Sequence, residues 1–320
     1  MRVSKIFGER NTFSLEVFPP KTDIGMEKLC GKGGVLEKLY TLSPDYISCT
    51  YGAGGTNVGK NLEVLEKIRQ DGKCIPMTHF TCVGNTREGI RQQLQTYLDH
   101  GIDHMLALRG DLPSGWSGTG GDLHYAVQLV KLVRAEFGDK FTVAVAATPE
   151  GHIASRSSEE DIGFLKRKQD EGADYIMTQL CWDMDRFRWW LDAIRAAGIW
   201  LPVDVGIMPV LDIAATINMT LSRNGCVMDS ALCKMISRHW IFPNPFEREP
   251  LDDFAEQKRR DFKEEGIEYT IRQIDQYRAC GVDGIHLYTL NKFDDVARIA
   301  REAGIIEPDW SSRQCAGSIW

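Results

Sequence analysis

Eight apolar, β-rich runs alternate with helical patterns along the 320 residues, and this alternation predicts an α/β protein built as a single-domain (β/α)₈ TIM barrel. Most of the runs are too apolar to expose one face to water, which is typical of parallel strands covered by helices. A doubly wound parallel sheet is the alternative. No Gly-x-Gly-x-x-Gly motif follows the first run, and its absence disfavours that alternative.

The predicted strands are short and are separated by enough chain for a helix, as βα units require. In chain order they are Phe13–Phe18, Tyr46–Thr50, Ile75–Thr81, His104–Leu108, Thr142–Ala147, Tyr175–Gln179, Val203–Met208 and Gly284–Tyr288.

Helical segments fill the stretches between these strands. Gly101, Gly172, Gly198 and Gly281 each follow such a segment, as glycines that end helices do. Ser158 precedes three acidic residues and indicates a helix start. The predicted helices are Met26–Leu42, Asn57–Asp71, Thr86–His100, Asp122–Glu136, Glu159–Glu171, Asp183–Ala197, a longer stretch over Asp212–Arg238 and Asp252–Cys280, and Phe293–Ala303.

Composition and charge exclude several classes of protein. Hydrophobic residues are 43% and charged residues 26% of the chain, as in a globular protein. A formal charge of −7 argues against a nucleic-acid partner. No apolar run approaches the ~20 residues that span a bilayer, and the first residues lack a signal-peptide core, so we expect a cytoplasmic protein without a membrane partner. We expect the barrel domain over residues 1–307 and a C-terminal tail over residues 308–320.

The nine cysteines are scattered and form no Cys-x-x-Cys pair, which favours packing roles over disulfides or metal binding. The nearest approach to a ligand set is Cys226, Cys233 and His239, and we predict no metal site. The aromatic stretch over residues 240–246 is interpreted as a lid or packing loop, and as a candidate docking surface if it is exposed.

A charged turn follows the fourth strand, where Arg109-Gly110-Asp111 comes directly after an apolar run. Ligands of an α/β barrel sit at the carboxyl ends of its strands. An Arg there could hold an anionic group, and a buried Asp could tune a cofactor. The alternative is a surface ion pair between Arg109 and Asp111.

Three other strands carry polar residues with distinct chemistry. Glu16 lies in an apolar strand, where burial would raise its pKa and make it a general acid; the alternative is a core carboxylate satisfied by Arg or Thr. His79 could be a base, a phosphate ligand or a core histidine. Gln179 suits the amide edge of a heteroaromatic ring, or else needs a partner in the core.

Taken in order, these strand ends resemble the methylenetetrahydrofolate reductase family, in its compact bacterial form without a regulatory domain. The resemblance covers about residues 10–305. The matching pieces are Glu16-Val17-Phe18-Pro19-Pro20-Lys21, Thr50-Tyr51-Gly52-Ala53, His79-Phe80-Thr81-Cys82, Ala107-Leu108-Arg109-Gly110-Asp111, Pro149-Glu150-Gly151-His152, Thr178-Gln179, Gly206-Ile207-Met208-Pro209 and Tyr288-Thr289-Leu290-Asn291.

The resemblance implies a flavin, usually FAD, that carries hydride by a ping-pong mechanism to methylenetetrahydrofolate and yields methyltetrahydrofolate. It implies that Glu16 is the general acid that opens the folate's five-membered ring, and that Asp111 modulates flavin and pterin. The implied folate-binding residues are Gln179, Tyr288 and Leu290. The implied flavin-binding residues are Thr50, His79, Leu108, Arg109, Gly110, Tyr125, Thr148, His152, Asp161 and Lys168.

Four positions depart from the family pattern. Thr148 stands where the family often has an aromatic residue, and Phe164 stands where a polar flavin contact is common. Ala215 and Met219 stand where Gln and Phe are common in the family and help to hold folate and nicotinamide. FMN therefore stays open beside FAD. NAD(P)H is the expected electron donor, with a partner protein as the alternative, so we expect a homo-oligomer or a complex with an electron-donating protein. A flavin-free folate-binding barrel subunit of a methyl-transfer complex is a further alternative.

Overall fold

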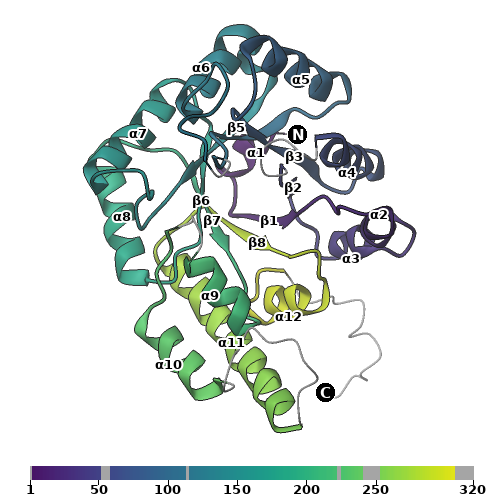
Figure 1. The fold of residues 1–320 in the computed structure, drawn as a ribbon, viewed down its shortest axis with the longest axis vertical. Helices are drawn as coiled ribbons and strands as arrows, with labels where there is room; N and C mark the ends of the chain where they lie inside the picture. The colour runs from purple at the N-terminus through teal and green to yellow at the C-terminus, as the bar shows by residue number, and fades with distance from the viewer. Residues whose placement is uncertain (1, 52–57, 113–114, 222–224, 241–252, 307–320) are drawn as a thin grey trace, which may run out of the picture.

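Eight parallel strands within the described residues close into a barrel in sequence order, with helices around the outside (Figure 1). The computed structural model describes residues 2–51, 58–112, 115–221, 225–240 and 253–306. The predicted (β/α)₈ barrel is confirmed, and the doubly wound alternative is wrong. The strands are β1 (Thr12–Val17), β2 (Tyr46–Cys49), β3 (Ile75–Thr81), β4 (His104–Leu108), β5 (Thr142–Ala147), β6 (Tyr175–Thr178), β7 (Val203–Ile207) and β8 (Gly284–Tyr288).

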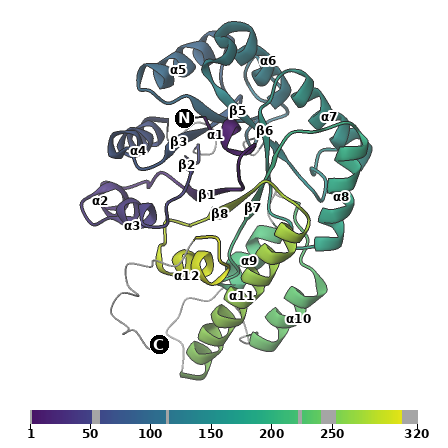
Figure 2. The same cartoon turned by 180° about the vertical axis from the view of Figure 1, so that it is seen from behind.

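The helices form an outer ring, which is seen from the other side in Figure 2. Leucine, isoleucine and valine side chains between ring and barrel make the main core, as the apolar strands predicted. The helices are α1 (Val3–Ile6), α2 (Asp23–Cys30), α3 (Val35–Tyr40), α4 (Val58–Asp71), α5 (Arg87–Asp99), α6 (Ala126–Phe137), α7 (Ser158–Asp170), α8 (Met184–Ala196), α9 (Ile213–Leu221), α10 (Ser230–His239), α11 (Asp253–Ala279) and α12 (Asp294–Glu302), with a 3₁₀ turn at Gly138–Lys140.

Two predicted helices are each divided. The segment expected over Met26–Leu42 is interrupted between α2 and α3, where Gly31, Gly33 and Gly34 lie and Gly33 has a φ of 71°. The stretch expected over Asp212–Arg238 contains α9 and α10. The helix-ending glycines are confirmed, because all four have positive φ. The cap of α7 is Ser157, one residue before the predicted Ser158; its side chain accepts from the Glu160 N–H.

The amino-terminal mouth of the barrel is filled by α1, which the sequence pattern did not predict. Val3 is fully buried among side chains from the first residues of several strands, including Tyr46 and Tyr175. The Val3 N–H donates to His104 Nε2 at 3.2 Å, and Phe7 packs on Tyr175 with ring centroids 4.9 Å apart. A ligand therefore reaches the interior from the carboxyl ends of the strands.

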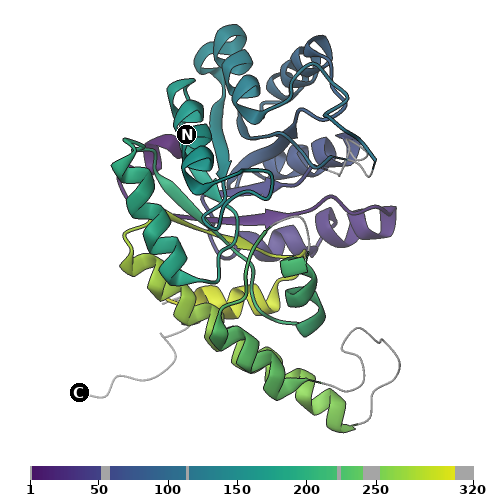
Figure 3. The same cartoon turned by 60° about the vertical axis from the view of Figure 1, so that its left-hand side comes forward.

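α10 and α11 pack together at one side of the barrel, and the first turns of α11 extend beyond it (Figure 3). Residues 241–246 of the aromatic stretch and the expected tail over residues 308–320 lie outside the described residues. Across the described ranges, no helix combines the length and apolar character needed to cross a membrane. The same ranges contain no cluster of His, Cys, Asp or Glu suited to a metal ion.

Candidate active site

A cavity of about 790 Å³ opens at the carboxyl ends of the strands. It is large enough for a cofactor and a small substrate together. All fifteen residues singled out from the sequence line it: Glu16, Thr50, His79, Leu108, Arg109, Gly110, Asp111, Tyr125, Thr148, His152, Asp161, Lys168, Gln179, Tyr288 and Leu290. The fold thus brings together residues that are up to 274 positions apart, since Glu16 and Leu290 face the same space.

Glu16 sits between two histidines at the floor of this cavity. Its Oε2 lies 3.5 Å from His79 Nε2 and 3.6 Å from His286 Nε2, and its side chain is 20% exposed. The Ser48 hydroxyl lies 3.2 Å from His79 Nε2 and 3.4 Å from His286 Nε2, so it joins the two rings. Among the described residues its ion-pair partners are these two histidines and no Arg, which differs from the core carboxylate held by Arg or Thr that was the alternative.

The expected rise in the pKa of Glu16 is wrong. Burial raises this pKa, but the hydrogen bond with His286 and the charges of His79 and His286 outweigh burial, so the pKa lies below its usual value. Burial also lowers the pKa of His79. Glu16 is therefore an ionised group that must receive its proton from a neighbour before it can act as an acid.

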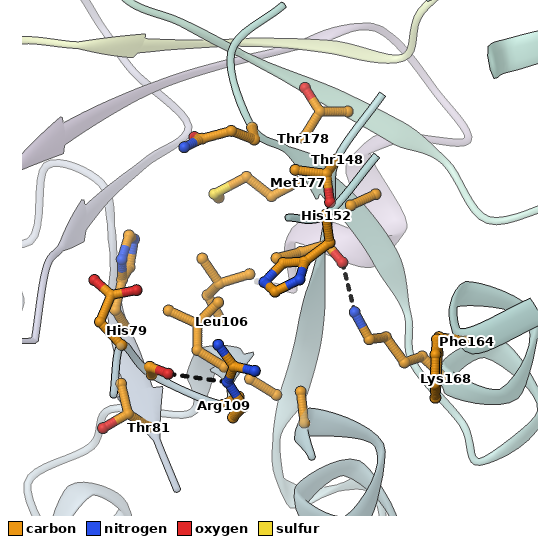
Figure 4. Close-up of a pocket in the computed structure, with 18 of the residues that line it drawn as sticks. His79, Thr81, Leu106, Arg109, Thr148, His152, Phe164, Lys168, Met177 and Thr178 are labelled. Atoms are coloured by element: carbon orange, nitrogen blue, oxygen red, sulfur yellow. Dashed lines mark hydrogen bonds between the residues drawn. The ribbon is translucent and has the colours of Figure 1, made fainter. Parts of the chain in front are cut away.

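The opposite side of the cavity is cationic. Figure 4 shows Arg109 and His152 facing the same space, with Lys168 reaching toward it from α7. Lys168 Nζ donates to the Ala146 carbonyl at 2.7 Å, and burial lowers its pKa to about 8. Burial, followed by the charge of Arg109, lowers the pKa of His152. This set of donors suits an anionic or electron-rich ligand.

The turn after β4 depends on glycine. Gly110 has a φ of 90°, and a Cβ there would lie 2.9 Å from Thr81 Cβ and 3.0 Å from Val83 Cγ2. Arg109 Nε donates to the Gly110 carbonyl at 3.2 Å, and in the described part of the chain Arg109 forms no ion pair with Asp111. The Asp111 side chain is exposed at the cavity rim, so the expectation of a buried Asp is wrong.

The aromatic and acidic residues of α6 and α7 form another wall. Tyr125, at the start of α6, stacks on Phe164 with ring centroids 6.1 Å apart and planes 21° apart. Asp161 accepts from the His152 N–H at 3.4 Å and from the Ser155 hydroxyl at 2.9 Å. Asp161 therefore fixes the loop that carries His152.

The substrate-side residues are held by β6, β7 and β8. Tyr288 donates its hydroxyl to Gln179 Oε1 at 3.2 Å, and the Leu180 N–H donates to the same oxygen at 3.3 Å. A Cβ at Gly206 would lie 2.5 Å from the Tyr288 hydroxyl, so glycine on β7 makes room for this contact. Tyr288 also pairs with Glu16 across the β1–β8 seam.

The loop after β8 clamps the end of β1. The Thr289 hydroxyl donates to the Glu16 carbonyl at 2.6 Å, and the Thr289 N–H donates to it at 3.1 Å. Asn291 Nδ2 donates to the Phe18 carbonyl at 2.8 Å, while the Phe18 N–H donates to Asn291 Oδ1 at 3.0 Å. These contacts fix the main chain that carries Glu16.

A buried polar network beneath Glu16 was missed by the sequence reasoning. It contains Ser14, Ser48, Asp204 and His286, all fully buried. The available signal was alternation: Ser14 and Glu16, like His286 and Tyr288, are two residues apart on one strand and point to the same side.

Comparisons with known proteins identify the family of this chain. A family model for methylenetetrahydrofolate reductase matches residues 2–304. A 5,10-methylenetetrahydrofolate reductase of Salmonella typhimurium is 30% identical over 95% of this chain and 94% of its own length. Methylenetetrahydrofolate reductase (NADH) 1 of Zea mays is 33% identical over 95% of this chain and 50% of its length. Methylenetetrahydrofolate reductase 1 of Schizosaccharomyces pombe is 31% identical over 93% of this chain and 47% of its own length. The chain spans about half the length of these plant and yeast relatives.

Among solved structures, a protein from Clostridium thermocellum that binds two copies of 5-methyl-5,6,7,8-tetrahydrofolic acid has a TM-score of 0.61. The match covers 95% of this chain and 98% of that one, at 14% sequence identity. At this identity the likeness shows a shared fold.

Proposed function

The chain belongs to the methylenetetrahydrofolate reductase family, and from this premise we propose that it is an oxidoreductase that reduces 5,10-methylenetetrahydrofolate to 5-methyltetrahydrofolate with a bound flavin. The observation that carries the proposal is the shared cavity. An acid–imidazole cluster at Glu16 lies on its floor, and a wall formed by the Arg109 and Lys168 cations together with the His152 ring lies across from it.

The residues present fit a flavin. Arg109, His152 and Lys168 supply donors for the electron-rich ring and an anionic phosphate, and Gly110 allows the turn that carries Arg109 to pack against Thr81 and Val83. Thr50, Leu108, Tyr125, Thr148 and Asp161 complete the proposed binding surface. When bound, the flavin takes up a hydride from the electron donor and passes it to the substrate.

Folate would occupy the side formed by Gln179, Tyr288 and Leu290. Oε1 of Gln179 already accepts from Tyr288 and Leu180, so its Nε2 is the atom that remains to donate to a pterin acceptor. Asp111, exposed at the rim, is proposed to modulate both ligands.

Glu16 is proposed to deliver a proton to the folate nitrogen that leaves the methylene carbon. The carbon–nitrogen bond of the five-membered ring then breaks, and the resulting iminium carbon can accept hydride. No nucleophile from the protein is needed, because hydride transfer requires a proton donor, correct orientation and exclusion of water. His79 and His286 are the groups placed to return a proton to Glu16.

The absorbance spectrum of the purified protein tests the proposal. We expect a flavin spectrum, FAD on release, and bleaching on addition of NADH or NADPH followed by reoxidation with methylenetetrahydrofolate. Release of FMN would correct the cofactor. Bleaching only by a reduced protein donor would favour the partner-fed reductase. A colourless protein that binds folate would contradict the proposal and favour a flavin-free barrel subunit.

Two further expectations belong to this proposal. The described cysteines are free thiols, as a reducing compartment maintains, and we infer a cytoplasmic location. A homo-oligomer or a complex with an electron-donating protein is expected, and sedimentation of the purified protein with and without a reduced donor protein distinguishes these states.

A further inference from the structure

Asp204, on β7, is a fully buried carboxylate with no place in the chemistry described so far. Its Oδ2 accepts from the Tyr46 hydroxyl at 2.6 Å, from Ser14 at 3.3 Å and from Thr12 at 3.5 Å. Its Oδ1 has no hydrogen-bond partner among the described residues. A Cβ at position 284 would lie 2.7 Å from that oxygen, so Gly284 makes room for the carboxylate.

Ser14 connects Asp204 to the floor of the cavity. Its hydroxyl lies 2.7 Å from His286 Nδ1, and the Nε2 atom of the same ring lies 3.6 Å from Glu16 Oε2. An ionised carboxylate only accepts hydrogen bonds, so Ser14 gives its single hydrogen to Asp204. In the contact between Ser14 and His286, Nδ1 must then be the donor and the Ser14 oxygen the acceptor.

This direction decides which nitrogen of His286 exchanges protons. With Nδ1 holding its hydrogen toward Ser14, Nε2 is the atom that gains and loses a proton, and Nε2 faces Glu16. We propose that Asp204 is a positioning residue which acts through Ser14 to hold His286 in this tautomer, so that His286 Nε2 can supply the proton that Glu16 delivers to folate. The inference rests on the proposed function.

The surroundings of Asp204 support this role. The titratable groups that face it are Tyr46 on β2, Tyr175 on β6, and His286 and Tyr288 on β8. Among them only His286 has a ring nitrogen that Ser14 contacts, so Ser14 is the link between Asp204 and the cavity floor. Burial raises the pKa of Asp204 to about 6, which leaves it ionised at neutral pH. A buried carboxylate with one unpaired oxygen lowers the stability of the fold. The presence of Asp204 in the barrel interior is therefore better explained by a role in the site than by a contribution to stability.

Nitrogen-15 NMR of histidine-labelled protein tests the tautomer without relying on activity. His286 is assigned by the signal lost in His286→Gln. We expect the wild-type Nδ1 to keep its hydrogen while Nε2 titrates, and the neutral ring in Asp204→Asn to carry its hydrogen on Nε2. Thr12→Val is the matched control, since it removes a donor to the same carboxylate and leaves the link from Ser14 to His286. An unchanged tautomer in Asp204→Asn would overturn the proposal.

Single-turnover reduction of methylenetetrahydrofolate by pre-reduced enzyme gives the second readout. We expect Asp204→Asn and Ser14→Ala each to slow this step about ten- to a hundred-fold and to change the pH profile of its rate, with no change in flavin reduction. The double variant should be no slower than either single variant, because both break one chain. Additive losses, or an unmoved pH profile, would contradict the role.

Two safeguards separate the possible outcomes. Ser14→Ala keeps the Tyr46 and Thr12 contacts to Asp204, so it carries the same test if Asp204→Asn fails to fold. If wild-type protein binds flavin and does not reduce the folate, the proposed function fails. The NMR experiment then still decides whether Asp204 sets the tautomer of His286.

Discussion

Replacement of Glu16 by Gln is the sharpest test of the site. Gln keeps the size of the side chain and cannot release a proton, so we expect folate reduction to fall by about 10²- to 10⁴-fold, which corresponds to roughly 3–5 kcal/mol in the barrier. The main chain should stay in place, because Thr289 bonds to the carbonyl of residue 16 and not to its side chain. The variant should therefore bind flavin normally.

The assay separates the two half-reactions by stopped-flow absorbance. Flavin reduction by the electron donor should proceed at the wild-type rate in Glu16→Gln, and reoxidation by methylenetetrahydrofolate should be the step that is lost. Glu136→Gln is a matched control, since Glu136 pairs with Arg91 on the outer helices and its loss should leave both steps unchanged. Reoxidation of Glu16→Gln at a rate near that of the wild type would refute the assignment of Glu16 as the acid.

Three further changes probe other parts of the chain. Gly110→Ala forces a side chain onto a φ of 90° and against Thr81, and should lower the free energy of unfolding by about 1–3 kcal/mol in urea denaturation, with loss of flavin. Gln179→Ala should raise the KM for folate about tenfold and leave flavin reduction unchanged; an unaltered KM would remove Gln179 from the folate site. Burial raises the pKa of Glu150 from 4.5 to about 7, so ionisation destabilises the fold as pH rises through that window. Because Glu150 is only partly buried and solvent screens its charge, Glu150→Gln should stabilise the protein above pH 7 by only about 1 kcal/mol and have little effect near pH 5, as measured by thermal unfolding at both pH values.

The barrel was predictable because strand and helix signals are local. The run from Met105 to Leu108 is apolar and directly precedes a charged turn, and the structure contains that strand with its expected bounds. The division of the segment from Met26 to Leu42 was missed, although its cause, three glycines within four residues, is also local. There the apolar pattern on both sides suggested one continuous helix.

The site was predictable as a list of residues and less so as an electrostatic arrangement. All fifteen predicted residues line the cavity, because parallel strands present their carboxyl ends, and the loops and helix starts that follow them, at one edge. The sign of the pKa shift of Glu16 depends on His79 and His286, and His286 arrives only when β8 pairs with β1. Likewise, Asp204 meets Ser14 across 190 residues, and no spacing along the chain encodes that contact.

The clamp of Thr289 and Asn291 on the end of β1 has a consequence for biosynthesis. β1 leaves the ribosome before β8, which is its second neighbour in the barrel and is followed by the residues that hold the carbonyls at the end of β1. During translation the nascent barrel therefore stays open along this seam, with Glu16 lacking its histidine from β8. Catalytic competence should appear abruptly, when the closing strand emerges, and shorter nascent chains should be inert.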